Sequence, residues 1–111
     1  MMTDQTIEEG KPMAILSYLT IFGVIITFFM NNDKKNEFTY FHIRQSLGLW
    51  VTFFALGYIV GIFDSWLITI SFWMFFGVLF LFGFMSAIVG KAQATPILGS
   101  LFQKLFAGLG K

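Results

Sequence analysis

The sequence predicts an all-α fold: an integral membrane three-helix bundle followed by a C-terminal amphipathic interfacial helix. Of its 111 residues, 57% are hydrophobic and only 12% are charged, whereas soluble domains carry about 25% charged residues. Sixteen Phe and three Trp would leave a soluble fold of this length with more apolar surface than it could bury. Long tracts without charge, residues 13–30, 45–63 and 66–89, supply the membrane-spanning candidates.

The N-terminal segment, residues 1–11, is polar and acidic. It lacks the basic region of a cleaved signal peptide and the Arg- and Ser-rich character of a transit peptide. We therefore expect a single membrane domain over residues 1–111, inserted through its own hydrophobic segments into a bacterial cytoplasmic (inner) membrane. Thr6 and Glu9 fit a capping box, although Gly10 argues against one continuous helix from Thr6.

The first membrane helix is predicted at residues 13–30, which contain no charge and lie near the short end of what spans ~30 Å of hydrocarbon. The polar residues 31–37 end this tract abruptly. They predict an exposed cytoplasmic loop.

The second and third membrane helices are predicted at residues 40–63 and 66–89, the second with an amphipathic lead-in from about Phe38. Asp64 and Ser65 form the only polar break between them. Because this connection is so short, the two helices are expected to form an antiparallel hairpin.

The C-terminal segment, residues 96–109, follows a second polar break and carries apolar residues at helical period. The segment is too short and too two-faced to span a bilayer, so we predict a helix that lies in the interface plane. The alternative is a frayed tail that packs on the bundle. The apolar residues are Ile97, Leu98, Leu101, Phe102, Leu105, Phe106 and Leu109.

The distribution of positive charge predicts an orientation. With three spans, the N-terminus and the Asp64 turn share one side, which carries only Lys11. The other side carries the remaining six basic residues, and the positive-inside rule places that side in the cytoplasm. The N-terminus is then expected outside and the C-terminus in the cytoplasm. The six residues are Lys34, Lys35, Arg44, Lys91, Lys104 and Lys111.

Small and hydroxylated residues form candidate helix-contact stripes, because they let membrane helices approach closely and form hydrogen bonds. One stripe on the second helix and one on the first are expected to face each other, and a GxxxG pattern on the second helix offers another contact, to the third helix or to another subunit. The second-helix stripe contains Arg44, Gln45, Gly48, Thr52 and Ala55, the first-helix stripe contains Ser17, Thr20, Gly23 and Thr27, and the GxxxG pattern is Gly57 and Gly61.

Candidate polar residues give little support to catalysis. His42 would serve as a proton shuttle or ligand, but no nucleophile–base pair or metal-ligand spacing accompanies it. Arg44 either reaches lipid phosphates or pairs inside the bundle, and Lys34, Lys35 and Lys104 are candidates for lipid headgroup contact. With no Cys and a net charge of +1, we expect no metal, no cofactor, no nucleic-acid partner and no enzymatic activity.

One block of residues carries a resemblance. The chain has an apolar helix, then a short charged loop, then the run Phe41-His42-Ile43-Arg44-Gln45-Ser46-Leu47. A Gly-Lys break and a Pro-Ile-Leu run precede its amphipathic end. This pattern resembles the small bacterial membrane proteins related to the chloroplast inner-envelope protein-import component. The resemblance implies an all-helical membrane fold and makes His42, Arg44 and Gln45 a docking or packing element. The chloroplast members are described with four membrane helices, whereas this chain is predicted to have three.

Three functions follow from these observations. The first is a small non-catalytic accessory or structural subunit of a larger inner-membrane assembly, with membrane lipids and other integral membrane subunits as partners. The second is a component of a protein-translocation or transport channel, for which a homo-oligomer is one option. The third, a lipid-acting enzyme, would require the polar residues near His42 to converge on a pocket.

Overall fold

The computed structural model describes residues 2–108, which form helices and no strands. The expected all-α class is therefore confirmed for these residues. The helices are α1 (Asp4–Leu19), α2 (Ile21–Lys34), α3 (Glu37–Ile62), α4 (Trp66–Ile88) and α5 (Gly99–Leu105). Leu109, the last residue of the predicted interfacial helix, and Lys111 lie outside the described residues.

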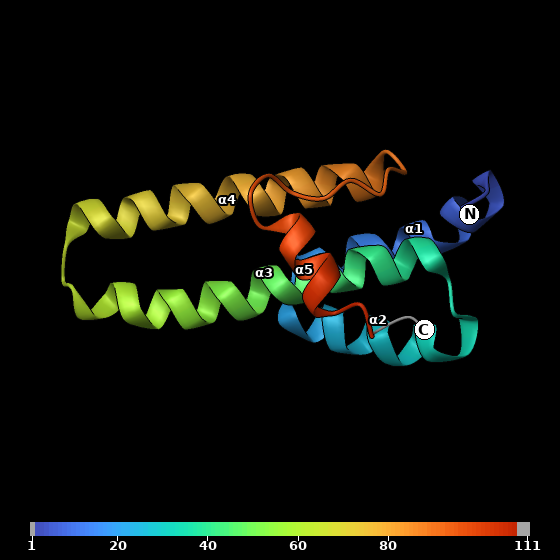
Figure 1. Cartoon of the computed structure of the whole chain (residues 1–111), viewed down its shortest axis with the longest axis horizontal. Coiled ribbons are helices and arrows are strands. Elements are labelled where there is room, and N and C mark those ends of the chain that lie inside the picture. Colours follow the sequence, from blue (N-terminus) through green and yellow to red (C-terminus); the bar gives the residue numbers. More distant parts are fainter. Residues whose placement is uncertain (1, 109–111) are drawn as a thin grey trace.

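The two longest helices, α3 and α4, run antiparallel and give the molecule its length (Figure 1). Asp64 adopts a left-handed conformation in the tight turn between them. Ser65 then caps α4, because its hydroxyl accepts a hydrogen bond from the backbone N–H of Ile68. Among the described residues, only α3 and α4 are long and apolar enough to cross a membrane.

The prediction of one straight helix over residues 13–30 is wrong. Thr20 has an extended backbone and separates α1 from α2. Its hydroxyl accepts the backbone N–H of Gly23 at 2.9 Å and so begins a new helix. Gly23 also lets α2 approach α1, since a Cβ at this position would overlap the carbonyl oxygen of Leu16. The chain therefore folds back at this point, which we call the Thr20 corner.

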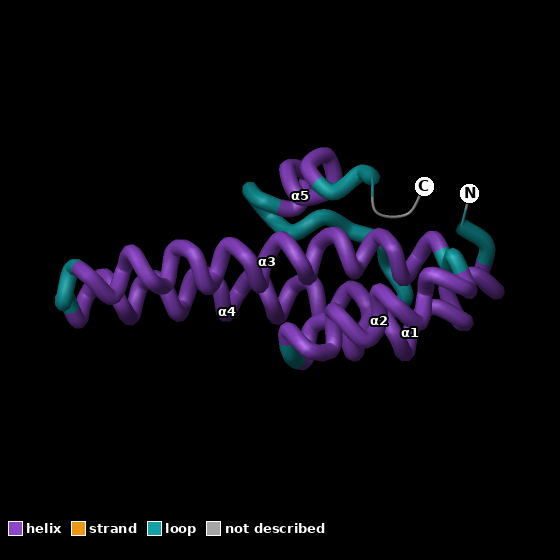
Figure 2. The backbone as a smooth tube through the Cα atoms, turned by 90° about the horizontal axis from the view of Figure 1, so that it is seen from below, coloured by secondary structure: helices purple, strands orange, loops and turns teal. Residues whose placement is uncertain are grey.

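The fold-back brings the N-terminal segment and the loop around residues 31–37 to the same end of the molecule (Figures 1 and 2). Asn36 donates through Nδ2 to the carbonyl oxygen of Thr6 at 2.9 Å, and Thr39 donates through Oγ1 to that of Gly10 at 3.1 Å. The expectation that a single helix separates these two segments is therefore wrong. It failed because an uncharged apolar tract does not reveal a capped break.

The buried residues lie at one end of the α3–α4 hairpin, which we call the packed end. In α3 they fall between Phe38 and Leu49, and in α4 between Phe76 and Ala87. None of residues 51–75, which we call the distal half, is buried. The helices α1, α2 and α5 thus cover only the packed end.

The last helix, α5, lies against α3 and is shorter than predicted. Ile97 adopts a left-handed backbone conformation, so the helix begins only at Gly99. Phe102 is buried where α3 presents Gly48, whose missing side chain leaves room for the ring. One apolar face of α5 is therefore buried on α3, while Leu101 and Leu105 remain exposed.

Candidate functional site: a buried hydrogen-bonded chain at the packed end

Five polar groups from three parts of the sequence meet inside the packed end. Tyr18 extends from α1, and His42 and Gln45 extend from successive turns of α3. The Tyr18 hydroxyl lies 2.6 Å from His42 Nδ1 and 2.8 Å from Gln45 Nε2. The segment after α4 completes the set, with the Lys91 carbonyl oxygen 2.9 Å from His42 Nε2 and the Thr95 amide 2.7 Å from Gln45 Oε1.

The partners fix the direction of every hydrogen bond in this chain. The Lys91 carbonyl can only accept, so His42 donates through Nε2 and accepts at Nδ1 from the Tyr18 hydroxyl. The Tyr18 oxygen accepts from the Gln45 amide, and Gln45 Oε1 accepts from the Thr95 N–H. This arrangement fits a neutral His42 imidazole in its Nε2–H tautomer.

Aromatic rings enclose His42. The ring centroids of Phe38, Phe41 and Tyr18 lie 4.7, 5.2 and 5.5 Å from that of the imidazole. His42 and Gln45 are fully buried, and both ring nitrogens of His42 are already engaged. Among the described residues no three His, Cys, Asp or Glu side chains come together to hold a metal ion. The arrangement therefore fastens the segment 91–95 to α1 and α3.

A second polar cluster ties the loop before α3 to both neighbouring helices. Asn31 is fully buried and exchanges two hydrogen bonds with the backbone of Asn36, at 3.0 and 3.1 Å. Asn36 caps α3 through the Thr39 N–H and also reaches Thr6. The sequence predicts an exposed loop over this stretch, and neither Asn31 nor Asn36 stood out as a candidate. The available signal was Asn36 directly before the helix, since Asn is among the residues preferred at an N-cap.

The predicted stripe of the first apolar tract lies mostly inside the protein. Thr27 donates through Oγ1 to the carbonyl oxygen of Met13 at 3.3 Å. Ser17 is fully buried, and its carbonyl oxygen accepts the Trp50 indole N–H at 3.2 Å. Thr20 forms the corner. These residues therefore hold α1, α2 and α3 together.

The predicted stripe of α3 divides between two neighbours. Gln45 faces Tyr18 of α1, whereas Gly48 faces Phe102 of α5. Arg44 also faces α5 and donates through Nε to Gln103 Oε1 at 2.8 Å. Thr52, one turn beyond Gly48, is half-buried. The two predicted stripes thus meet only in part.

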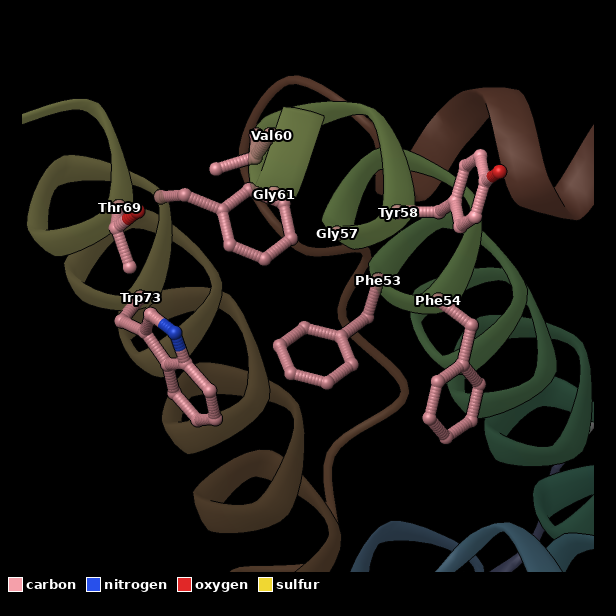
Figure 3. Close-up of a pocket in the computed structure, with 9 residues that line it drawn as sticks. Phe53, Phe54, Gly57, Tyr58, Val60, Gly61, Thr69 and Trp73 are labelled. Carbon is pink, nitrogen blue, oxygen red and sulfur yellow. The ribbon is translucent and has the colours of Figure 1, made fainter. Parts of the chain in front are cut away.

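Gly57 and Gly61 lie in the distal half, where α3 and α4 border a cleft of about 420 Å³. A Cβ at Gly57 would contact the Phe72 ring at ordinary distance, and one at Gly61 would meet nothing within 4 Å. Figure 3 shows Phe53 and Trp73 extending towards the space between the helices. Within residues 2–108, the GxxxG pattern therefore forms no close helix contact.

The candidate headgroup residues Lys34, Lys35 and Lys104 are all exposed. Lys34 and Lys35 lie at the end of α2, and Lys104 lies in the last turn of α5. Their ammonium groups are accessible for contact with anionic groups.

Comparisons of the chain with protein-family models, with curated proteins and with solved structures find no match. The resemblance to the import-component relatives therefore stays a prediction from the block around His42.

Proposed function

We propose that the chain is a small non-catalytic membrane protein that α3 and α4 insert into the bilayer. The observation that carries this proposal is the exposure of their apolar surface. In the most apolar 18-residue stretch of each helix, only 22% of α3 and 17% of α4 is buried. A core helix of a soluble protein would be mostly buried, whereas lipid tails solvate such a surface.

The distribution of charge favours an orientation that differs from the one expected for three spans. No basic residue lies between Arg44 and Lys91, a stretch that includes the whole distal half and the Asp64 turn. The N-terminal segment shares the packed end with the loop 31–37. The positive-inside rule then puts the packed end on the cytoplasmic side of the membrane, with both termini in the cytoplasm and the Asp64 turn outside. We propose the bacterial cytoplasmic membrane as the location.

A structural role in a larger membrane assembly is the function that this geometry supports best. The polar side chains of His42, Gln45 and Tyr18 form hydrogen bonds with one another and with the backbone, so they hold the helices together. The hydroxyls of Thr27 and Ser17 also bond inside the chain, which gives less support to a polar transport path. The translocation alternative therefore rests mainly on the resemblance.

Single cysteines test the orientation, because the chain has no native Cys. Asn32→Cys and Asp64→Cys place the thiols at exposed positions at opposite ends of α3. With a membrane-impermeant maleimide on intact cells stripped of their wall, we expect labelling at position 64 only. Position 32 should react after the membrane is opened. Labelling of both thiols from the outside would contradict the proposal.

Purification in a mild detergent tests the role as a subunit. The expected result is a stable complex with one or more other integral membrane proteins. Recovery of a clean monomer with no co-purifying protein would count against it, whereas conductance by the purified chain in liposomes would favour the transport alternative.

A further inference from the structure

The molecule is much thicker at the packed end than in its distal half. At the packed end, α1, α2 and α5 lie against α3 and α4, whereas the distal half consists of α3 and α4 alone (Figures 1 and 2). The change is abrupt, since burial stops after Leu49 in α3 and begins at Phe76 in α4.

The Thr20 corner marks the level of this change. Trp50, at the middle of α3, donates to the carbonyl oxygen of Ser17 just before the corner. Tyr18 and Leu19 share a hollow of about 300 Å³ with Gly77, at the middle of α4. The α1–α2 pair therefore reaches half the length of the hairpin.

The outer face of α2 is suited to lipid tails. Phe22, Ile25 and Phe29 are 71%, 48% and 67% exposed, and they follow one another at helical spacing. Two groups at the corner are already paired, because Thr20 caps the Gly23 N–H and Trp50 covers the Ser17 carbonyl. This pairing reduces the cost of irregular backbone at membrane depth.

We propose that the chain acts as an asymmetric wedge that favours curved membranes, with its wide end in the outwardly curved leaflet. The proposal rests on the insertion of α3 and α4 argued above. Each helix with its side chains is ~10 Å across, so four helices occupy about twice the area of two. One leaflet accommodates α1 to α4 with α5 on their side, and the other accommodates only the distal half. The partner is the lipid bilayer itself.

Reconstitution tests this wedge directly. The Asn32→Cys chain, labelled with a dye, is incorporated into phosphatidylcholine–phosphatidylglycerol vesicles of different radii, and protein density per lipid area is measured on single vesicles. We expect the density to rise by roughly twofold or more towards the smallest vesicles, a preference of ~0.4 kcal/mol. A membrane-impermeant quencher added outside should also reach a larger fraction of the dyes at position 32 as vesicle radius falls. The reason is that small vesicles favour the orientation with the packed end in the outer leaflet.

The outcomes separate the wedge from the insertion. A density and a quenched fraction that do not change with radius, while dyes at positions 32 and 64 lie on opposite sides, would overturn the wedge and leave the insertion intact. Dyes at both positions on the same side would overturn both.

A matched pair of glycines tests whether the corner creates the effect. Gly23→Leu forces α2 away from the Leu16 carbonyl, whereas a Cβ added at Gly77 meets no atom within 4 Å. We expect Gly23→Leu to weaken the dependence on radius and Gly77→Leu to retain it. If both variants lose the dependence on vesicle radius to the same extent, the role of the corner is overturned. If Gly23→Leu does not fold, the radius dependence of the protein without this substitution still tests the wedge.

Discussion

The hydroxyl oxygen of Tyr18 lies 2.6 Å from Nδ1 of His42, and this contact joins α1 to α3 across 24 positions of sequence. Both side chains are buried, and each has a further partner. Because a buried polar group without a partner loses its hydration at full cost, Tyr18 and His42 stabilise this arrangement only as a pair. The contact is therefore a sensitive point for testing the packed end.

Replacing Tyr18 with Phe should destabilise the protein by about 1–3 kcal/mol, since it leaves His42 Nδ1 and Gln45 Nε2 without the hydroxyl. The measurement is the free energy of unfolding in mixed detergent micelles. Tyr58→Phe is the control, because Tyr58 is 77% exposed and surface changes usually stay within about 0.5 kcal/mol. Equal effects of the two substitutions would contradict the buried chain.

Replacing Gln45 with Leu should loosen the segment that follows α4. Gln45 Oε1 accepts the Thr95 N–H at 2.7 Å, and loss of about 1 kcal/mol from one hydrogen bond speeds amide exchange roughly fivefold. Hydrogen exchange at the Thr95 amide measures the effect. Thr52→Val changes a half-buried polar residue two turns further along α3 and should leave this amide unchanged. Faster exchange in both variants would point to general loosening of α3.

Local patterns in the sequence were sufficient for the α-helical class and for the antiparallel hairpin around Asp64 and Ser65. Hydrophobic length and a polar break are encoded within a few residues. The Thr20 corner was not predictable in this way, because Thr is common inside apolar helices and acts as a cap only when the chain turns back. Gly23, three residues on, was read as part of a contact stripe, whereas it also permits the close approach to Leu16.

The candidate site was predicted in part for a similar reason. His42 and Gln45 stood out because they are polar residues beside an apolar tract. Their partners did not, since Tyr18 lies within the first tract and Thr95 lies 50 positions from Gln45. Long-range pairs of this kind follow from the fold-back of α1 and the return of the chain after α4.

Replacing Asn36 with Ala should destabilise the protein by about 1–2 kcal/mol, the usual cost of losing a helix cap. Asn36 caps α3 through the Thr39 N–H and also holds Thr6. Asn32→Ala is the matched control, because Asn32 is exposed in the same turn region. Thermal unfolding in detergent measures both. A smaller loss for Asn36→Ala than for Asn32→Ala would contradict the tie between the N-terminal segment and the loop.

Replacing Gly48 with Ala should displace α5, because the added methyl group would overlap the Phe102 ring. Overpacking of this kind costs about 1–3 kcal/mol. Trypsin cleavage after the exposed Lys104 should become faster as α5 detaches from α3. Gly61→Ala is the control, since its Cβ would meet nothing within 4 Å. Unchanged cleavage in Gly48→Ala would place α5 elsewhere.

Replacing Gly23 and Gly77 separately with Ala should change stability in opposite directions. Ala favours a helix over Gly by about 0.5–1 kcal/mol, and at Gly77 nothing opposes this gain because the space around it is open. At Gly23 the methyl group would overlap the carbonyl oxygen of Leu16, and backbone cannot yield as a flexible side chain can. We therefore expect Gly77→Ala to stabilise the protein and Gly23→Ala to destabilise it, as measured by the free energy of unfolding. Stabilisation by both substitutions would mean that residues 13–30 form the single straight helix that their composition predicts.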